Sequence, residues 1–167
     1  YAHIQMISAS GYSIFMATGC IVEDAVFPVG ETVFYRASNN AFRNAQFNGE
    51  VTLNGNAAFK NARFRDNCTL YGSNAFDTVT FDNPGKTIFL ESGKIQTFHF
   101  VFKILAAEQQ KINLKSSIPG VAAVLSSSIP ELCFEHLSIQ DIAVTGGTVF
   151  KAGSYADDLG NNSGCLF

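Results

Sequence analysis

Four basic side chains near the middle of the chain are the first candidates for a binding function. They are Arg43, Lys60, Arg63 and Arg65. Guanidinium and ammonium groups bind carboxylates and other anions. Presented together on one surface, they would bind an acidic polysaccharide or a neighbouring subunit. As separate solvated charges, they would only discourage aggregation.

A second group of candidate ligands lies in the segment ADDLGNN near the C-terminus. Asp157, Asp158 and Asn161 carry the hard oxygen ligands that calcium takes from turns. Segments rich in Asn, Asp and Gly are also typical of ordinary turns that bind nothing. Calcium is therefore the one candidate cofactor, and no other cofactor is expected.

Paired carboxylates could also hydrolyse a glycosidic bond if they converged on it. The chain offers Asp77 with Asp82, and Asp157 with Asp158. The sequence contains no G-x-S-x-G, H-E-x-x-H or P-loop pattern. We therefore expect no enzyme activity, and keep a polysaccharide lyase or hydrolase as the enzymatic alternative.

The three histidines are expected to be structural or surface residues rather than catalytic ones. They are His3, His99 and His136. Strict alternation along a strand would place Phe98, Phe100 and Phe102 on one face and His99 on the opposite face.

The elements that must position these residues are predicted by an internal repeat. The segment AFRNAQFNGEVTLNGNA, from Ala41, is followed directly by AFKNARFRDNCTLYGSN, from Ala58. A degraded third copy, AFDTVTFDN, begins at Ala75, so the repeat length is 17 residues. Repeats of this kind are typical of solenoids, in which each unit buries its apolar face against its neighbours.

Within one copy the large apolar side chains are Phe42, Phe47 and Leu53, spaced five and six residues apart. A helix would space them by three or four residues. A three-sided coil explains the spacing, with one inward side chain on each short strand and Asn, Gly or Asp at the corners. Parallel stacking would align three interior ladders. The ladders are Phe42, Phe59 and Phe76, then Phe47, Phe64 and Phe81, then Leu53 and Leu70.

The predicted fold is therefore all-β, a single-domain parallel β-helix (β-solenoid) spanning residues 1–167 with three-sided coils. Residues 1–30 would form an N-terminal cap or a first coil, and residues 31–91 the short coils of the 17-residue repeat. Residues 92–167 would form longer coils and a C-terminal cap. Coils of that length favour a right-handed solenoid. Phe34 is expected in the position that Leu53 takes one coil later.

The composition agrees with a β-rich protein, because charged residues are few and Phe, Val, Thr, Asn and Gly are many. Charged residues make up only 15 % of the chain and the net charge is -3, which argues against a nucleic-acid partner. No apolar run is long enough to insert into a membrane as a helix. The chain begins at Tyr1, so we expect a mature or excised segment from which any signal peptide has gone.

The cysteines show no C-x-x-C spacing typical of metal sites. They are Cys20, Cys68, Cys133 and Cys165. An even number in a secreted protein permits disulfides, but the pairing stays open. Cys68 lies on the same predicted strand face as Leu70, so we expect it to be a small buried side chain.

The C-terminal region, residues 112–167, resembles a module that ends many large secreted surface proteins of Bacteroidetes and related gliding or marine bacteria. The Phe/Asn/Gly repeat is similar to the central coils of those proteins. Cys165 stands where the family has Trp. The resemblance implies a β-helix at the cell surface or outside the cell, and no catalytic residues. The matching residues are Ser116, Ser117, Pro119, Gly120, Ile139, Asp141, Gly146, Gly147, Gly160, Asn161, Asn162, Gly164 and Phe167.

These observations predict a non-enzymatic, secreted or cell-surface structural or adhesive module. Its expected partners are like subunits stacked end to end, as in a filament or stalk, or the coils of a larger parent chain. A carbohydrate-binding module, with glycans as partners, is the alternative.

Overall fold

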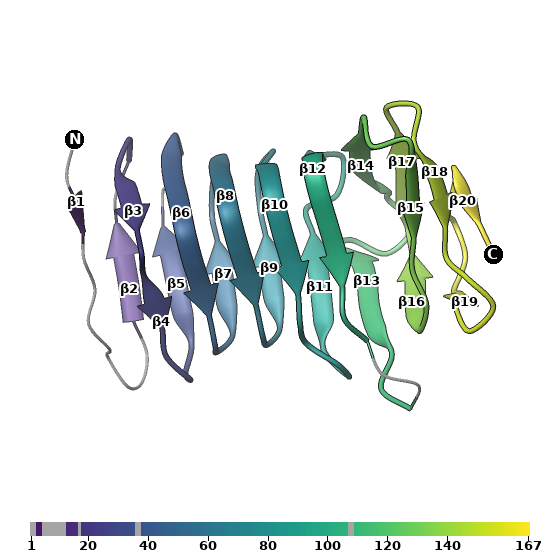
Figure 1. Ribbon diagram of the computed structural model, residues 1–167, viewed down its shortest axis with the longest axis horizontal. Helices are drawn as coiled ribbons and strands as arrows, with labels where there is room; N and C mark the ends of the chain where they lie inside the picture. Colours follow the sequence, from purple (N-terminus) through teal and green to yellow (C-terminus); the bar gives the residue numbers. More distant parts are fainter. Residues whose placement is uncertain (1–2, 5–12, 17, 36–37, 107–108) are drawn as a thin grey trace.

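The chain winds into a parallel β-solenoid with its sheets running along the long axis (Figure 1). The computed structural model describes residues 3–4, 13–16, 18–35, 38–106 and 109–167. Within these ranges the regular structure consists of strands and turns, and the pairings between successive coils are parallel. The all-β, parallel β-helix prediction is confirmed.

Three sheets are formed by the described strands. Sheet A contains β1 (His3–Ile4), β3 (Ile21–Glu23), β4 (Val26–Phe27), β6 (Asn40–Phe47), β8 (Ala57–Phe64), β10 (Ala75–Phe81), β12 (Ile95–Ile104), β14 (Ala123–Ser127) and β17 (Ile142–Thr145). Sheet B contains β2 (Ser13–Met16), β5 (Thr32–Tyr35), β7 (Val51–Leu53), β9 (Cys68–Leu70), β11 (Thr87–Leu90), β13 (Ile112–Ser116), β16 (Leu137–Gln140) and β19 (Asp157–Asp158). Sheet C contains β15 (Glu131–Cys133), β18 (Val149–Lys151) and β20 (Cys165–Leu166).

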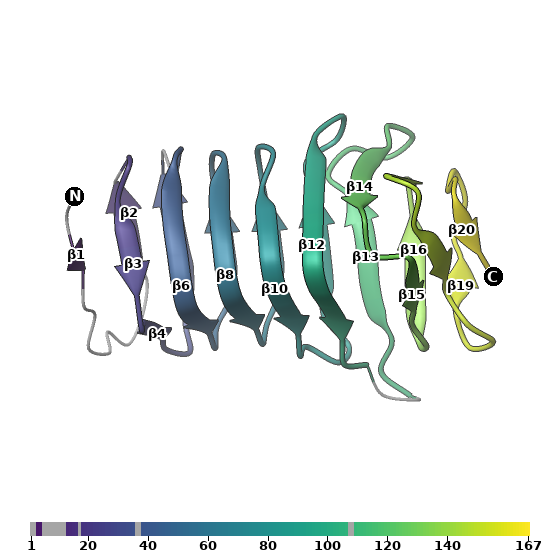
Figure 2. The same cartoon turned by 45° about the horizontal axis from the view of Figure 1, so that its top comes forward.

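The solenoid is right-handed. In Figure 1 the near strands of sheet A run downward and the more distant, fainter strands of sheet B run upward, while the chain advances from left to right. Figure 2 shows the same alternation after the molecule is turned about its long axis. The handedness therefore agrees with the sequence prediction.

Each coil of the repeat has three sides, because the long strands of sheet A are bent in the middle. The bends lie at Asn44 (φ 51°) and Asn61 (φ 62°), in the left-handed region that Asn tolerates better than most residues. Gly55 and Gly72 also have positive φ, at the corner that follows sheet B. The predicted corner chemistry of Asn and Gly is therefore confirmed.

The interior contains the predicted aromatic ladders. The Phe42 and Phe59 rings stack with centroids 4.9 Å apart, and the Phe59 and Phe76 rings with centroids 4.8 Å apart. The Phe47 and Phe64 rings stack at 4.8 Å in the second ladder. These separations match the spacing of about 4.8 Å between strands, so each ring packs face to face on the ring one coil away.

The ladders extend beyond the repeat. Phe98 stacks on Phe76 with centroids 5.1 Å apart, and Phe27 stacks on Phe47 at 4.8 Å. In sheet B, Phe34 pairs in register with Leu53, as its predicted role requires. Leu53 in turn pairs with Leu70, and Leu70 with Leu90.

Buried polar groups at one corner are joined by side-chain amides. Asn74 accepts a hydrogen bond from the backbone N–H of Ala57 (2.9 Å) and donates one to Gln96 (3.0 Å). Gln96 donates to the carbonyl of Gly72 (2.8 Å). Asn74 and Gln96 are both buried. These bonds provide partners for groups that would be costly to bury alone.

The prediction that Phe98, Phe100 and Phe102 share one face is wrong. Phe98 and Phe102 are buried, but 72 % of Phe100 is exposed. The register explains the difference, because Phe76 pairs with Phe98 and Thr78 pairs with Val101. β12 therefore has two residues, His99 and Phe100, opposite one residue of β10. This bulge turns Phe100 outward.

Candidate functional site

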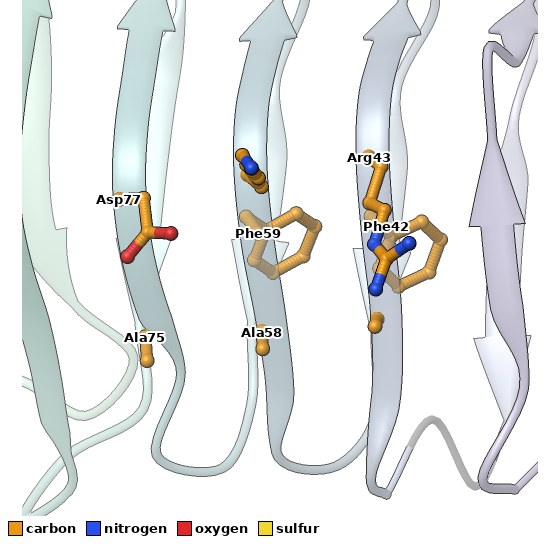
Figure 3. A pocket seen from close by; sticks show the side chains of 8 residues that line it. Phe42, Arg43, Ala58, Phe59, Ala75 and Asp77 are labelled. Atoms are coloured by element: carbon orange, nitrogen blue, oxygen red, sulfur yellow. The ribbon is translucent and has the colours of Figure 1, made fainter.

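A shallow groove crosses the outer face of sheet A, parallel to the solenoid axis. Its floor is a row of small side chains from three successive coils, since Ala41 pairs with Ala58 and Ala58 with Ala75. A depression of about 220 Å³ lies over this row and is also lined by Arg43, Lys60 and Asp77. Figure 3 shows Arg43 and Asp77 projecting outward, with the Phe42 and Phe59 rings behind the strands.

Charged side chains form one wall of the groove. Arg43 Nη1 lies 3.9 Å from Glu23 Oε1 on the preceding coil. Lys60 pairs in register with Arg43, so two cations occupy neighbouring strands. Such like charges repel each other. Among the residues that the structure describes, no carboxylate lies within 4.0 Å of the Lys60 ammonium group.

The opposite wall consists of corner residues. A second depression of about 220 Å³ shares the alanine floor and is lined by Asn39, Asn56 and Ser73. These side chains can donate and accept hydrogen bonds. The groove therefore has an apolar floor between a charged wall and a neutral polar wall.

The structure divides the four predicted basic residues into two groups. Arg43 and Lys60 line the groove. Arg63 instead donates a hydrogen bond from Nε to Asp82 Oδ2 (3.1 Å) and pairs with the same oxygen through Nη2. Arg65 Nε lies 3.7 Å from that oxygen. Arg63 and Arg65 therefore share the single carboxylate of Asp82, away from the groove.

The structure does not bring together the first carboxylate pair considered for hydrolysis. Asp77 lines the groove, whereas Asp82 follows the end of β10 and binds Arg63. Two carboxylates must lie on opposite sides of a single glycosidic bond to hydrolyse it. Asp77 and Asp82 do not have this arrangement.

The C-terminal acidic residues are held in two separate networks. Asp157 binds the Lys111 ammonium group (2.6 Å) and accepts a hydrogen bond from the Ser138 hydroxyl (2.9 Å). The bond from Lys111, followed by that from Ser138, lowers the pKa of Asp157 below its usual range.

Asp158 and Asn161 stabilise the turn that follows. Asp158 accepts hydrogen bonds from Gly160 N (2.9 Å) and Asn162 Nδ2 (2.7 Å). Asn161 donates to Asp141 Oδ1 (2.7 Å) and has a positive φ of 56°. No cluster of three or more His, Cys, Asp or Glu side chains suited to a metal ion occurs in the described part of the chain. Calcium binding stays a prediction.

The histidines lie in different elements: His3 in β1, His99 in β12 and His136 in the turn between β15 and β16. His99 is exposed beside Phe100 on the bulge of β12. His136 stacks on Tyr155 with ring centroids 5.0 Å apart and occupies a left-handed corner (φ 58°). The side chain of His3 lies outside the described set.

All four cysteines are free thiols. Cys68 is fully buried within the third ladder, as predicted, and burial raises the pKa of its thiol. Cys133 and Cys165 lie in the two outer strands of sheet C, with β18 between them. Two strand spacings amount to about 9.6 Å, which exceeds the distance of about 7 Å that a disulfide can bridge.

Sequence reasoning missed the groove and the exposed Phe100. A signal was present, because FDTVTF in β10 aligns with FHFVFKI in β12 only if one extra residue is allowed. The extra residue forms the bulge between the buried Phe98 and Phe102. The groove floor also had a signal, because Ala41 and Ala58 occupy the same position of the repeat, next to the inward Phe42 and Phe59.

Within the described residues, no helix has the length and apolar character needed to cross a membrane. Comparison with known proteins found no matching family model, no matching curated protein and no matching solved structure. The resemblance to bacterial surface modules therefore stays a prediction.

Proposed function

We propose that this chain is a structural and adhesive module of a secreted or cell-surface protein. Its function is to present its outer faces from a rigid stack of coils. The continuous interior ladders carry this proposal. Stacked rings connect Phe42, Phe59, Phe76 and Phe98 across four coils, and each is buried. Closely packed side chains fill this interior, as in a solenoid that serves as a scaffold.

The exposed surface of the last described coil supports the stacking of further coils on it. Its strands β19 and β20 end sheets B and C, and Ser163 pairs with Ala143 of β17 at the end of sheet A. Tyr155, Leu159 and Leu166 are exposed on this coil. Strand edges with exposed apolar side chains suit pairing with another coil, either of a second copy or of a longer parent chain. We propose end-to-end contact through this surface.

Analytical ultracentrifugation and negative-stain electron microscopy test the proposed end-to-end contact. We expect the wild-type chain to form particles elongated along the solenoid axis as its concentration rises. Leu166→Asp should prevent this assembly, because it buries a charge between coils. Ile118→Asp alters an equally exposed side chain in a loop and should leave assembly unchanged. A wild-type chain that stays monomeric at every concentration would exclude self-assembly.

Glycan binding is the second candidate function, and the groove on sheet A favours it. The groove is open at the surface, runs along the axis and combines an apolar floor with charged and amide side chains. Carbohydrate sites use such combinations, because sugars present both apolar C–H faces and hydroxyl groups. A module that binds glycans through this groove would be an adhesin in the same structural role.

A further inference from the structure

We propose that the groove binds a linear acidic polysaccharide whose chain runs parallel to the solenoid axis. The inference rests on the glycan-binding function proposed above and specifies its ligand. The polysaccharide lies on the alanine floor, with a carboxylate at Arg43 and Lys60 and one sugar ring against Phe100.

The floor continues past the alanines. Ala75 pairs with Thr97, and Thr97 pairs with Ser126. Ala41, Ala75, Thr97 and Ser126 are partly exposed, and Ala58 is exposed. Because these side chains are short, a linear ligand can lie close to the strands over several coils.

The charged wall favours an acidic ligand. Arg43 and Lys60 lie side by side, and a carboxylate between them would relieve their mutual repulsion. Asp77 lines the same depression one coil later and can accept a hydrogen bond from a sugar hydroxyl.

Phe100 supplies an apolar contact at the end of this wall. The bulge in β12 sets His99 and Phe100 opposite Asp77, and 72 % of Phe100 is exposed. Bulges re-aim side chains, and they occur frequently at functional sites. An outward Phe ring next to charged residues offers a stacking surface for the C–H face of a sugar.

The spacing of the wall distinguishes a polysaccharide from a peptide. Its side chains recur once per coil, at about 4.8 Å. One pyranose of an extended chain covers nearly the same distance, so successive sugars would meet successive coils. An extended peptide repeats its side chains on one face every 6.8 Å or so. Successive peptide side chains would therefore not stay aligned with the side chains of successive coils.

Isothermal titration calorimetry with defined oligosaccharides tests the proposal. The probes are oligogalacturonates of increasing length, compared with uncharged cello-oligosaccharides of the same lengths. We expect oligogalacturonate affinity to rise with length until the ligand spans the wall from Arg43 to Phe100. The affinity should fall as salt is added, because the charged contacts are screened.

Three variants alter the groove, and three matched variants alter the outer face of sheet B. Ala58→Phe fills the floor and should weaken oligogalacturonate binding about tenfold or more. Lys60→Ala and Phe100→Ala should each weaken it about fivefold. Thr69→Phe, Lys115→Ala and Phe89→Ala are the matched controls, because these residues point outward from sheet B. They should leave the affinity within about twofold of wild type.

The possible outcomes distinguish an error in the proposed binding site from an error in the proposed glycan-binding function. If wild type binds glycans and Ala58→Phe binds them equally well, the groove is not the site, although the glycan-binding function stands. If the uncharged probes bind as tightly as the oligogalacturonates, the ligand is not acidic. If wild type binds neither probe series, the polysaccharide proposal and the glycan-binding function are both wrong, while the scaffold function is unaffected.

Discussion

Asn61 donates a hydrogen bond from its Nδ2 to the Oδ1 of Asn44, one coil earlier, over 3.0 Å. Asn44 donates in the same way to Asp24 Oδ1 over 2.9 Å. All three residues have positive φ, of 62°, 51° and 51° respectively. The corner that bends sheet A is therefore stabilised by a polar ladder on the outside and by stacked Phe rings on the inside.

Replacing Asn61 should show how much this corner contributes. Asn61→Ala removes the hydrogen bond and places a less tolerant residue in a left-handed conformation, so we expect a loss of about 1–2 kcal/mol in the free energy of unfolding. Asn61→Gly removes the same bond but adopts the conformation easily, and should cost less. Urea denaturation of both variants measures the difference. Equal losses would show that the hydrogen bond, and not the backbone conformation, dominates.

The Phe59 ring should contribute more than the polar ladder, because it stacks on both neighbours. Phe59→Ala would leave a cavity between Phe42 and Phe76 and should lower the free energy of unfolding by about 3–5 kcal/mol. Phe59→Leu fills most of the space and should cost about 1–2 kcal/mol.

Phe100→Ala is the internal control for the ladder measurement. Its side chain is largely exposed on the bulge, so truncation should leave the urea midpoint nearly unchanged. A large loss of stability in Phe100→Ala would mean that the ring packs against the protein in solution, and that it is not available to a ligand.

The repeat allowed the interior to be predicted because inward positions are chemically constrained. A ladder position must be apolar in every coil. The spacing of Phe42, Phe59 and Phe76 therefore predicts both the length of the repeat and the stacking of these rings. The corners were predictable for a related reason, since left-handed angles favour Gly and Asn.

The outer face was less predictable. The contacts of an outward side chain depend on the register between strands and on the residues of the neighbouring coil. Arg63 is adjacent to Phe64 in sequence, yet Asp82 of the next coil determines its charge environment. Phe100 follows the alternating pattern of an inward residue, but one extra residue in β12 reverses its direction. A shift of one residue moves a side chain to the other face, and alternation within β12 alone does not reveal it; only alignment with β10 does.

Gly49 should be intolerant of a side chain for a purely steric reason. A Cβ at this position would lie 2.0 Å from the carbonyl oxygen of Gly30 on the preceding coil. Gly49→Ala must therefore force two stacked turns apart, and we expect a loss of about 3 kcal/mol or more in the free energy of unfolding.

Gly93→Ala provides the comparison for Gly49→Ala. Gly93 has a positive φ of 70°, but a Cβ there meets no atom within 4 Å. Gly93→Ala should therefore lower the free energy of unfolding only through the left-handed backbone conformation, by about 1–2 kcal/mol. Thermal unfolding of the two variants would rank them. A smaller effect at Gly49 would contradict the close stacking of these turns.

Thiol modification should report on the unfolding of the third ladder. Cys68 is fully buried, and burial raises the pKa of its thiol, so it should react with iodoacetamide only when the coil opens. Burial, with a smaller contribution from the Asp158 charge, raises the pKa of Cys165 to about 11. Its reaction rate should therefore keep rising with pH into that range. Mass spectrometry of peptides after timed labelling would measure both. Rapid labelling of Cys68 in the native protein would contradict its buried position.

The contact between Lys111 and Asp157 should make the last coil sensitive to acid. The bond from Lys111 lowers the pKa of Asp157 below its ordinary value of 3.8, so the ionised carboxylate is favoured in the folded state. Its stabilisation is therefore fully present above that ordinary value, and is lost as the pH falls through the lower folded pKa.

Hydrogen exchange at the Leu159 amide measures this effect locally, because that N–H bonds to the carbonyl of Ile139 between the last coils (2.9 Å). Asp157→Asn should exchange faster than wild type near neutral pH, and the two should converge once the pH lies below the folded pKa of Asp157. Glu131→Gln removes a separate pair with Lys151 (2.7 Å) on sheet C, and it should not change exchange at Leu159. A difference between wild type and Asp157→Asn that persists at low pH would show that the carboxylate charge is not the cause.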